Sequence, residues 1–183
     1  DSGSEDNTVE IATDLGARVF HQDWQGYSAT KNIGNNLVQH DWILSLDADE
    51  VLSERLIESI EELELKTNEV YLLDRSNYFC GKSIRFSHWN YDRIPRLFNR
   101  NTAHWQGDFV HEKLIYIPGT KTRLLKGKLL HYSYENYQQR KDKVINYAHL
   151  SAQKRFLEGK NTCLLYTSPS PRDRTRYRMP SSA

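Results

Sequence analysis

Two aspartates, Asp47 and Asp49, follow a nearly continuous apolar run at residues 42–46. Such a run is typical of a β-strand buried on both faces, and open α/β sheets bind ligands at the carboxyl ends of their strands. Carboxylate oxygens are the ligands that hard divalent cations prefer, and a bound cation can neutralise a departing diphosphate. The spacing predicts a site where one aspartate meets a ribose and the other a metal.

The same Asp-x-Asp spacing also occurs in proteins of different chemistry. An EF-hand loop needs glycine at its sixth position, which is Leu52 here. A phosphatase with an aspartyl nucleophile usually continues Asp-x-Asp-Gly-Thr, whereas this chain continues with Glu50 and Val51. A solvated turn, or a cap on the helix that follows, stays open as the non-catalytic alternative.

A second group of acids surrounds Gly107, and we expect it to supply a base. Glu112 is the candidate and Asp108 the reserve, because a carboxylate that is ionised near pH 7 can take a proton from an attacking hydroxyl. Gly107 lets the backbone approach a ligand closely. A surface ion pair between Glu112 and Lys113 or Arg123 is the alternative.

An aromatic and polar cluster lies between these two segments. Trp89, Asp92 and Arg96 are its main members, and a flat ring beside directional hydrogen-bonding groups suits a sugar. We therefore predict an acceptor-side wall here. Core packing of Trp89 and an ion pair of Arg96 are equally compatible with the sequence.

The elements that position these residues follow from hydrophobic periodicity. Apolar residues three and four apart predict helices at 8–15, 28–38, 53–65 and 137–157. Short β-branched and aromatic runs predict strands at 17–20, 42–46, 69–74, 76–80, 94–98, 110–117, 121–125 and 128–132. Helices and strands alternate at first, which indicates a parallel sheet covered by helices. We therefore expect an α/β domain at 1–160, with a nucleotide-sugar-binding half at 1–68 and a strand-rich acceptor half at 69–160.

The two ends of the chain differ from its body. The segment Asp-Ser-Gly-Ser at the start is typical of a turn, so we expect a strand to precede it. Residues 161–183 hold three of the five prolines and four arginines without any period, and they resemble translated sequencing-adapter read-through. We leave this segment out of the domain. A disordered basic tail is the alternative.

Composition narrows the class of protein. The body is ordinary for a globular protein, and without the tail its acidic residues slightly outnumber its basic ones, which gives no support for nucleic-acid binding. Two distant cysteines, Cys80 and Cys163, favour a reducing compartment. No apolar run approaches the roughly 18 residues of a membrane span.

The motifs in their order resemble those of family 2 glycosyltransferases over about residues 1–160. They are Asp1–Thr8, Trp24–Gly26, Lys31–Asn32, Asp41–Glu50, Arg96–Phe98, Val110–Glu112 and His131–Tyr132. The likeness is greatest to the lipopolysaccharide-core β-glucosyltransferase group. It implies a GT-A fold, with a mixed, mostly parallel sheet between helices and an N-terminal strand that this chain lacks. It also implies inverting transfer of a hexose, expected to be glucose, from a UDP-sugar to a hydroxyl on a saccharide or glycolipid acceptor.

The resemblance also implies a role for each site residue. Asp1 would lie near the nucleoside, Lys31 near the base or phosphates, and Asp47 near the ribose. Asp49 would hold Mg²⁺ or Mn²⁺, His131 would contact the metal or diphosphate, and Glu112 would be the catalytic base. A solvated Lys31 and a purely structural His131 stay open as alternatives.

Two further functions remain compatible with the sequence. A nucleotidyltransferase acting on a sugar phosphate shares the metal at a sheet edge, but it normally has a glycine-rich phosphate loop near the N-terminus. A non-catalytic sugar-binding fragment is the second. For a glycosyltransferase we expect a cytoplasmic location, with peripheral association at the inner membrane, where lipid-linked acceptors would lie.

Overall fold

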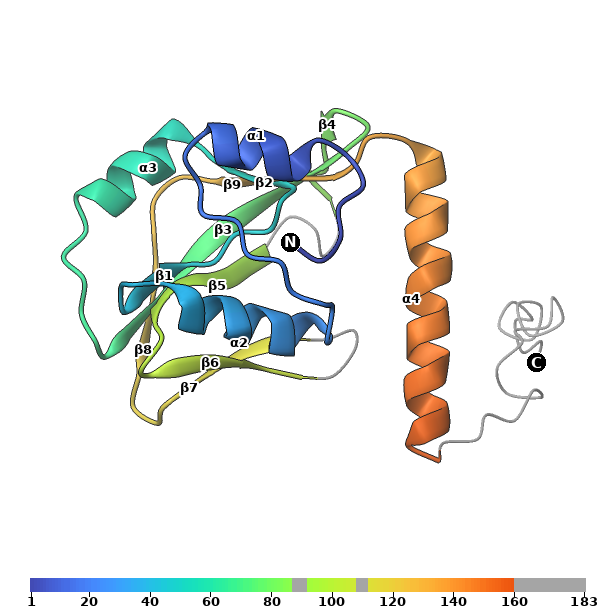
Figure 1. Ribbon diagram of the computed structural model, residues 1–183. Helices are drawn as coiled ribbons and strands as arrows, with labels where there is room; N and C mark the ends of the chain where they lie inside the picture. The colour runs from blue at the N-terminus through green and yellow to red at the C-terminus, as the bar shows by residue number, and fades with distance from the viewer. Residues whose placement is uncertain (87–91, 108–111, 160–183) are drawn as a thin grey trace, which may run out of the picture.

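The computed structural model describes residues 1–86, 92–107 and 112–159, and it forms a mixed sheet with four helices (Figure 1). The helices are α1 (Thr8–Asp14), α2 (Tyr27–Leu37), α3 (Glu54–Glu61) and α4 (Tyr137–Leu157). The strands are β1 (Trp42–Leu44), β2 (Glu50–Leu52), β3 (Glu69–Phe79), β4 (Lys82–Ser83), β5 (Asp92–Asn99), β6 (Ala103–Gln106), β7 (Lys113–Tyr116), β8 (Lys121–Leu124) and β9 (Leu129–Tyr134). The predicted tail at 161–183 lies outside the described residues.

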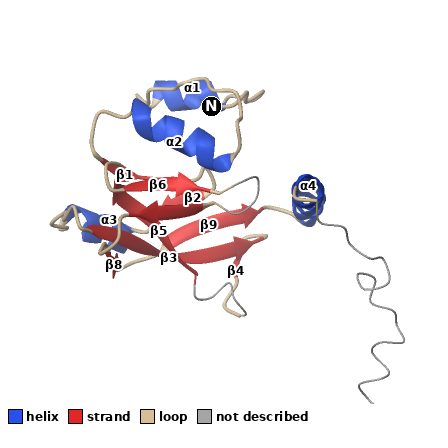
Figure 2. Ribbon diagram, turned by 90° about the horizontal axis from the view of Figure 1, so that it is seen from below, coloured by secondary structure: helices blue, strands red, loops and turns tan. Residues whose placement is uncertain are grey.

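The main sheet has the order β1-β5-β3-β9-β2, with β4 and β8 also paired to β3 (Figure 2). Strand β3 runs parallel to β8 and β9 but antiparallel to β5 and β4. The outer strands β1 and β2 pair antiparallel with β5 and β9. The α/β class and the mixed sheet are confirmed. The expected excess of parallel pairs is wrong for the described strands, because β1 and β2 find their neighbours in the second half of the chain.

The strand predicted at 17–20 is not formed, which removes a parallel neighbour from the first half. Val19 and Phe20 are 36% and 42% exposed, so the β-branched and aromatic pattern that predicted a strand does not fill a core. The segment runs beside Asp1 instead. The Asp1 amino group donates to the Phe20 carbonyl at 2.7 Å, and the Gln22 amide donates to the Asp1 carbonyl at 2.8 Å.

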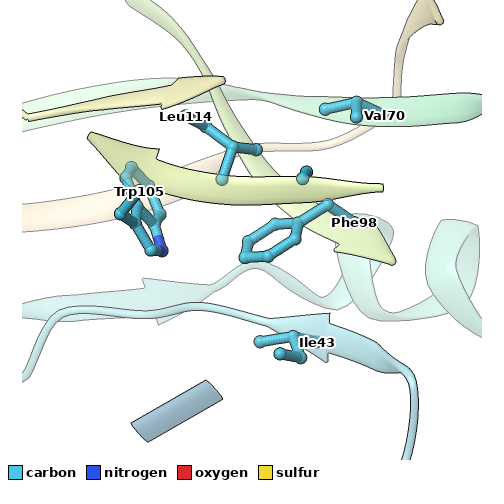
Figure 3. Close-up of a cluster of buried hydrophobic side chains, with 6 residues drawn as sticks. Ile43, Val70, Phe98, Trp105 and Leu114 are labelled. Carbon is cyan, nitrogen blue, oxygen red and sulfur yellow. The ribbon is translucent and has the colours of Figure 1, made fainter. Parts of the chain in front are cut away.

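The sheet has an apolar cluster on each face, because successive side chains of a strand point to opposite sides. On β3, Val70 enters one cluster while Tyr71 and Leu73 enter the other. The first cluster fills the space between the sheet and the antiparallel β6–β7 hairpin (Figure 3), and its members are Ile43, Val70, Phe98, Ala103, Trp105 and Leu114. The second comprises Leu56, Tyr71, Leu73, Leu97, Leu125 and Leu129. Burial of each large apolar side chain stabilises the fold by about 1.5–3 kcal/mol.

Helix α3 begins on the turn that precedes β9. The Ser53 hydroxyl accepts from the Lys128 amide at 2.9 Å, and the Ser53 amide donates to the Lys128 carbonyl at 3.0 Å. Gly127 in that turn has φ +106° and lies so close that a Cβ would be 2.4 Å from the Leu56 amide nitrogen. Only glycine fits this approach. The turn therefore fixes where β9 starts.

Helix α4 projects from one side of the sheet and contacts the rest of the molecule through a few side chains, Lys143 and Tyr147 among them (Figures 1 and 2). None of its residues is buried, and its bounds match the predicted 137–157. The Asn136 side chain caps the helix by accepting from the Gln139 amide at 2.9 Å. Lys143 lies 5.3 Å from the ring centroid of Tyr134 on β9. No helix in the described ranges combines the length and apolarity that crossing a membrane would need.

Candidate functional site

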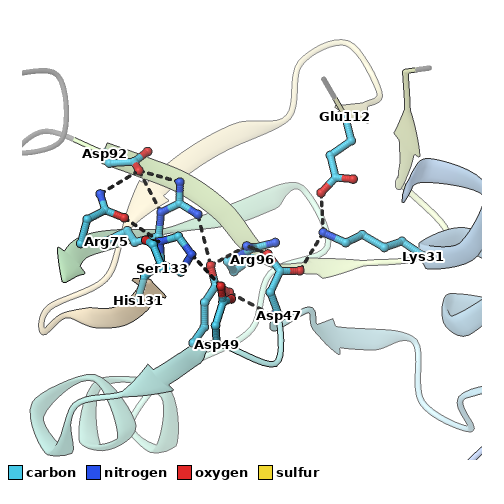
Figure 4. Close-up of polar contacts among 11 residues, drawn as sticks. Lys31, Asp47, Asp49, Arg75, Asp92, Arg96, Glu112, His131 and Ser133 are labelled. Atoms are coloured by element: carbon cyan, nitrogen blue, oxygen red, sulfur yellow. Dashed lines mark hydrogen bonds and ion pairs between the residues drawn. The ribbon is translucent and has the colours of Figure 1, made fainter. Parts of the chain in front are cut away.

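The segment at residues 45–49 joins β1 at one side of the main sheet to β2 at the other (Figure 4). It must therefore pass the strands between them, β5, β3 and β9. The Ser45 amide donates to the Arg96 carbonyl on β5 at 2.8 Å, and the Asp49 carbonyl accepts from the Tyr132 amide on β9 at 2.9 Å. These bonds hold both ends of the crossing, so its carboxylates lie against polar side chains of three strands.

A cavity of about 840 Å³ opens beside this crossing. Lys31, Asp47, Asp49, Glu112 and His131 all line it, although they are separated by up to 100 residues of sequence. Further lining residues are Tyr27, Arg75, Asn77, Asp92, Lys113, Ser133, Tyr134, Lys143 and Tyr147. Five of the residues singled out from the sequence are thus brought to one cavity, with Asp92 as a sixth.

Asp47 lies between two cations. One carboxylate oxygen is 3.0 Å from Lys31 Nζ, and the other accepts from Arg96 Nη2 at 2.5 Å. Burial acts to raise the pKa of Asp47, but the charges and hydrogen bonds of Arg96 and Lys31 outweigh it and hold the pKa below its ordinary value. Asp47 is therefore ionised and already neutralised by the protein.

Glu50 lies beneath the crossing, with a side chain that is 0% exposed. Its Oε1 accepts from Arg96 at 2.6 Å and from Arg75 at 3.3 Å, and its Oε2 accepts from the Asp47 amide at 3.1 Å. Arg75 also donates to Asp92 Oδ2 from two nitrogens, at 2.8 and 2.6 Å. Through these hydrogen bonds, the buried Glu50 carboxylate connects Asp47 to Asp92 in one network.

Asp49 lies beside His131, and its surroundings are different. Its Oδ2 is 3.2 Å from His131 Nε2. The hydrogen bond with His131 is the main reason that the pKa of Asp49 lies below its ordinary value, opposed by burial and assisted by the charges of His131 and Lys143. Within residues 1–86, 92–107 and 112–159, no group of three or more His, Cys, Asp or Glu side chains is placed to hold a metal.

Glu112 precedes β7 and is held by Lys31. Its Oε1 accepts from Lys31 Nζ at 2.5 Å, while Oε2 is shielded and has no hydrogen-bond partner among the described residues. Lys31 also lies 4.7 Å from the ring centroid of Trp105. The neighbouring Asn32 exchanges two hydrogen bonds with the Trp105 backbone, at 2.7 and 2.9 Å, and so fixes α2 against β6. The solvated alternative for Lys31 is therefore wrong.

Two of the predicted residues that the structure describes, Asp1 and Arg96, do not line this cavity. Asp1 lines a second, largely apolar cavity of about 570 Å³ between α1 and α2, and its carboxylate accepts from Gly3 and Ser4. Trp89 and Asp108 lie outside the described residues. Arg96, predicted for the acceptor side, is 4% exposed and contacts the carboxylates of the crossing instead.

Several residues of the cavity were not predicted from the sequence. Glu50 directly follows the Asp-x-Asp motif, and nothing in the sequence marks it as buried. Arg75 and Asn77, two apart on β3, share one face of that strand, a signal that was hidden because a break between two strands was predicted there. Tyr27 and Tyr147 bring their hydroxyls within 3.5 Å, and burial, with the Tyr27 contact, raises the pKa of Tyr147.

Comparison with known proteins identifies the family of this chain. The family described as Glycosyl transferase family 2 matches residues 1–127. An uncharacterised glycosyltransferase of Rickettsia typhi is 30% identical over 173 residues, which cover 87% of this chain and 59% of that protein. The lipopolysaccharide core biosynthesis glycosyltransferase LpsC of Rhizobium meliloti is 27% identical over 180 residues, covering 92% of this chain and 66% of LpsC. The glycosyltransferase GlyG of Streptococcus pneumoniae is 32% identical over 128 residues, covering 58% and 40%.

The matches cover only part of the relatives. The chain spans 59% of the length of the Rickettsia typhi relative, so the rest of that protein has no counterpart in the comparison. The family match nevertheless includes the whole crossing, Lys31 and Glu112, and excludes only His131 among the cavity residues predicted to act on a donor or acceptor. The chain belongs to glycosyltransferase family 2.

Proposed function

We propose that this protein is an inverting, metal-dependent glycosyltransferase that moves a hexose from a UDP-sugar to a hydroxyl of a saccharide acceptor. The observation that carries the proposal is the meeting of Asp47, Asp49, His131 and Glu112 around one cavity. A volume of about 840 Å³ lies in the range of small-molecule and cofactor sites, roughly 300–1,000 Å³. The similarity to LpsC favours a lipopolysaccharide-core or related glycan as acceptor.

A divalent cation fits the Asp49 side of the cavity. Asp49 offers a carboxylate oxygen and His131 a ring nitrogen, 3.2 Å apart and both facing the cavity. Mg²⁺ usually takes only one or two protein carboxylates and completes its shell with phosphate oxygens and water. Two protein ligands therefore suffice if a donor diphosphate supplies others. When bound, Mg²⁺ or Mn²⁺ would neutralise charge on the leaving diphosphate.

Asp47 and Lys31 suit the nucleotide end of the donor. Asp47 keeps its charge at neutral pH because Arg96 and Lys31 hold its pKa low, so it can accept hydrogen bonds from ribose hydroxyls. Lys31 is 19% exposed and lies between Asp47 and Glu112, within reach of a phosphate placed in the cavity. Its ammonium group would add to the charge that draws a diphosphate to this end.

Glu112 suits the role of base. Lys31 holds one of its oxygens, which fixes the direction of the carboxylate. The other oxygen has no donor among the described residues, and an ionised oxygen left unpaired is costly. An acceptor hydroxyl at that oxygen would supply the missing hydrogen bond. It could then pass its proton to Glu112 as it attacks the anomeric carbon from the face opposite the diphosphate.

The test is turnover of UDP-glucose by the full-length protein with Mn²⁺ or Mg²⁺ and a lipopolysaccharide-core oligosaccharide, measured as UDP release. Glu112→Gln should lower the rate by about 10²–10⁴-fold while UDP binding is kept. Asp49→Ala should lower it by about 10³-fold because several kcal/mol of charge stabilisation are lost. Glu61→Gln, an exposed acid on α3, is the matched control. Wild-type turnover in both site variants would contradict the proposal.

A non-catalytic sugar-binding protein would behave differently in the same experiment. It would bind UDP-glucose without releasing UDP, and its affinity for the sugar would not depend on Mn²⁺. Calorimetric titration of UDP-glucose with and without Mn²⁺ therefore separates a binding protein from the enzyme proposed here.

A further inference from the structure

Both ring nitrogens of His131 have polar neighbours. Nδ1 is 2.6 Å from Asn77 Oδ1 and 3.0 Å from Ser133 Oγ, while Nε2 is 3.2 Å from Asp49 Oδ2 (Figure 4). A neutral imidazole carries one N–H, so one nitrogen donates and the other accepts. The Asn77 carbonyl oxygen and the Asp49 carboxylate can both only accept. The contact at Nδ1 is the shorter, 2.6 Å against 3.2 Å at Nε2, and so short an N···O contact requires a proton on Nδ1.

The orientation of the Asn77 amide is set by the next residue in the network. Asn77 Nδ2 donates to Asp92 Oδ2 at 3.4 Å, and Arg75 holds that same oxygen through two nitrogens. A flipped amide would place the Asn77 oxygen against the Asp92 carboxylate, which would be repulsive. The oxygen therefore faces His131.

The backbone keeps this contact in place. Asn77 on β3 and His131 on β9 are partners in the parallel ladder, and Asn77 is 4% exposed. The ladder keeps the two backbones side by side, and the burial of Asn77 restricts the rotamers that its side chain can adopt. Ser133, by contrast, carries a hydroxyl that can donate or accept, so it does not select one tautomer of His131.

We propose that Asn77 is a positioning residue that fixes the proton of His131 on Nδ1. In the neutral ring Nε2 is then unprotonated, and the proton that Nε2 shares with Asp49 when the ring is charged is the one that a cation replaces. Nε2 and the Asp49 carboxylate, 3.2 Å apart, are then two acceptors beside one cation, as when a ligating histidine donates its other N–H to a carbonyl. The tautomer follows from hydrogen bonding alone, whereas its use for a metal rests on the proposed function.

The first experiment observes the tautomer directly in metal-free protein. Nitrogen-15 NMR of the histidine rings, recorded at a pH where the His131 ring is neutral, should show a proton on Nδ1 and none on Nε2. Asn77→Leu removes the acceptor and should give a mixture of tautomers. Asn77→Asp keeps an acceptor and should retain the wild-type form, as should Ser133→Ala. A proton on Nε2 in the wild-type protein would overturn the proposal even if Asn77→Leu does not fold.

The second experiment asks whether the tautomer matters to a cation. Mn²⁺ affinity is measured by electron paramagnetic resonance in the presence of UDP. Loss of an outer partner of a ligating histidine usually weakens metal binding about 10–100-fold, and Asn77→Leu should show a loss in that range. Equal Mn²⁺ affinity in wild type and Asn77→Leu would refute the positioning role. If wild type binds no Mn²⁺, the proposed function fails while the tautomer result still stands.

Discussion

Asp47 and Asp49 are two residues apart and their side chains are equally exposed, at 35%, yet their surroundings differ. Asp47 contacts two protein cations, Lys31 and Arg96. Asp49 contacts one imidazole, that of His131, whose other nitrogen faces Asn77. Equal exposure means that solvent does not cause the difference. Two protein cations neutralise Asp47, whereas in the proposed function Asp49 is the aspartate that meets an external cation.

The strand order explains how so short a segment can have two such different ends. Residue 47 lies over β5, which carries Arg96, whereas residue 49 lies over β9, which carries His131. Strand β3 separates β5 from β9 in the sheet. A short sequence separation therefore becomes a separation of two strands.

The largest loss of stability is expected at Glu50, because its carboxylate pairs with both Arg96, which contacts Asp47, and Arg75 on β3. Glu50→Ala would leave the buried Arg96 and the partly buried Arg75 without their shared carboxylate. Removal of one partner of a buried ion pair costs about 3–5 kcal/mol, and we expect about 4 kcal/mol here. Urea unfolding measures the loss. Glu58→Ala, which breaks an exposed pair with Arg55, should cost less than about 1 kcal/mol and is the control. Equal costs would show that Glu50 is not the shared support.

A smaller effect is expected at Gly127, which supports the Asp49 side only. Gly127→Ala brings a methyl group to 2.4 Å from the Leu56 amide nitrogen and must displace the turn that starts β9. We expect a loss of about 3 kcal/mol from overpacking and backbone strain together. Gly119→Ala, at φ +87° with open space around it, should lose only the strain of about 1 kcal/mol. Thermal unfolding of both variants measures the two losses of stability. Similar losses would show that the close approach of Gly127 to Leu56 is not the cause.

The smallest effect is expected at Lys31, which supports the Asp47 side and Glu112. Lys31→Met removes one charge-assisted contact worth about 1.5 kcal/mol, so affinity for UDP-glucose should fall about 10-fold. Mn²⁺ affinity in the presence of UDP should stay near that of wild type, because Asp49 and His131 are untouched. Lys31→Arg, which keeps the charge, should recover part of the donor affinity. A variant that lost Mn²⁺ as well would mean that the two sides are not independent.

Sequence periodicity was sufficient for the elements that depend on local signals. The helix at 137–157 was predicted with its observed bounds, since a continuous helical pattern follows the capping residue Asn136. It was insufficient for short strands. β2 has three residues and exists because Glu50, Val51 and Leu52 pair with β9, a contact that no local pattern encodes. The strand expected at 17–20 had the right composition but found no ladder.

The site residues that belong to sequence motifs could be predicted, whereas those that strand pairing brings together could not. Asp47, Asp49, Glu112 and His131 were named from the sequence, and they do line one cavity. Asn77 was not named, because its importance comes from the β3–β9 register that sets it beside His131. Glu50 looked like an ordinary acid in a turn, and only its burial between Arg75 and Arg96 reveals its role.

The proposed chemistry depends on Asp49, and not Asp47, binding the metal that a donor diphosphate shares. Titration of Mn²⁺ into wild type, Asp49→Asn and Asp47→Asn, each saturated with UDP, measures this dependence. Asp49→Asn should weaken Mn²⁺ binding by about 100-fold. That is the upper end of the loss caused by removing a residue that only supports a metal ligand. Asp47→Asn should change the Mn²⁺ affinity by less than about 5-fold. Equal weakening in the two variants, or a larger loss in Asp47→Asn, would show that the metal is not held by Asp49.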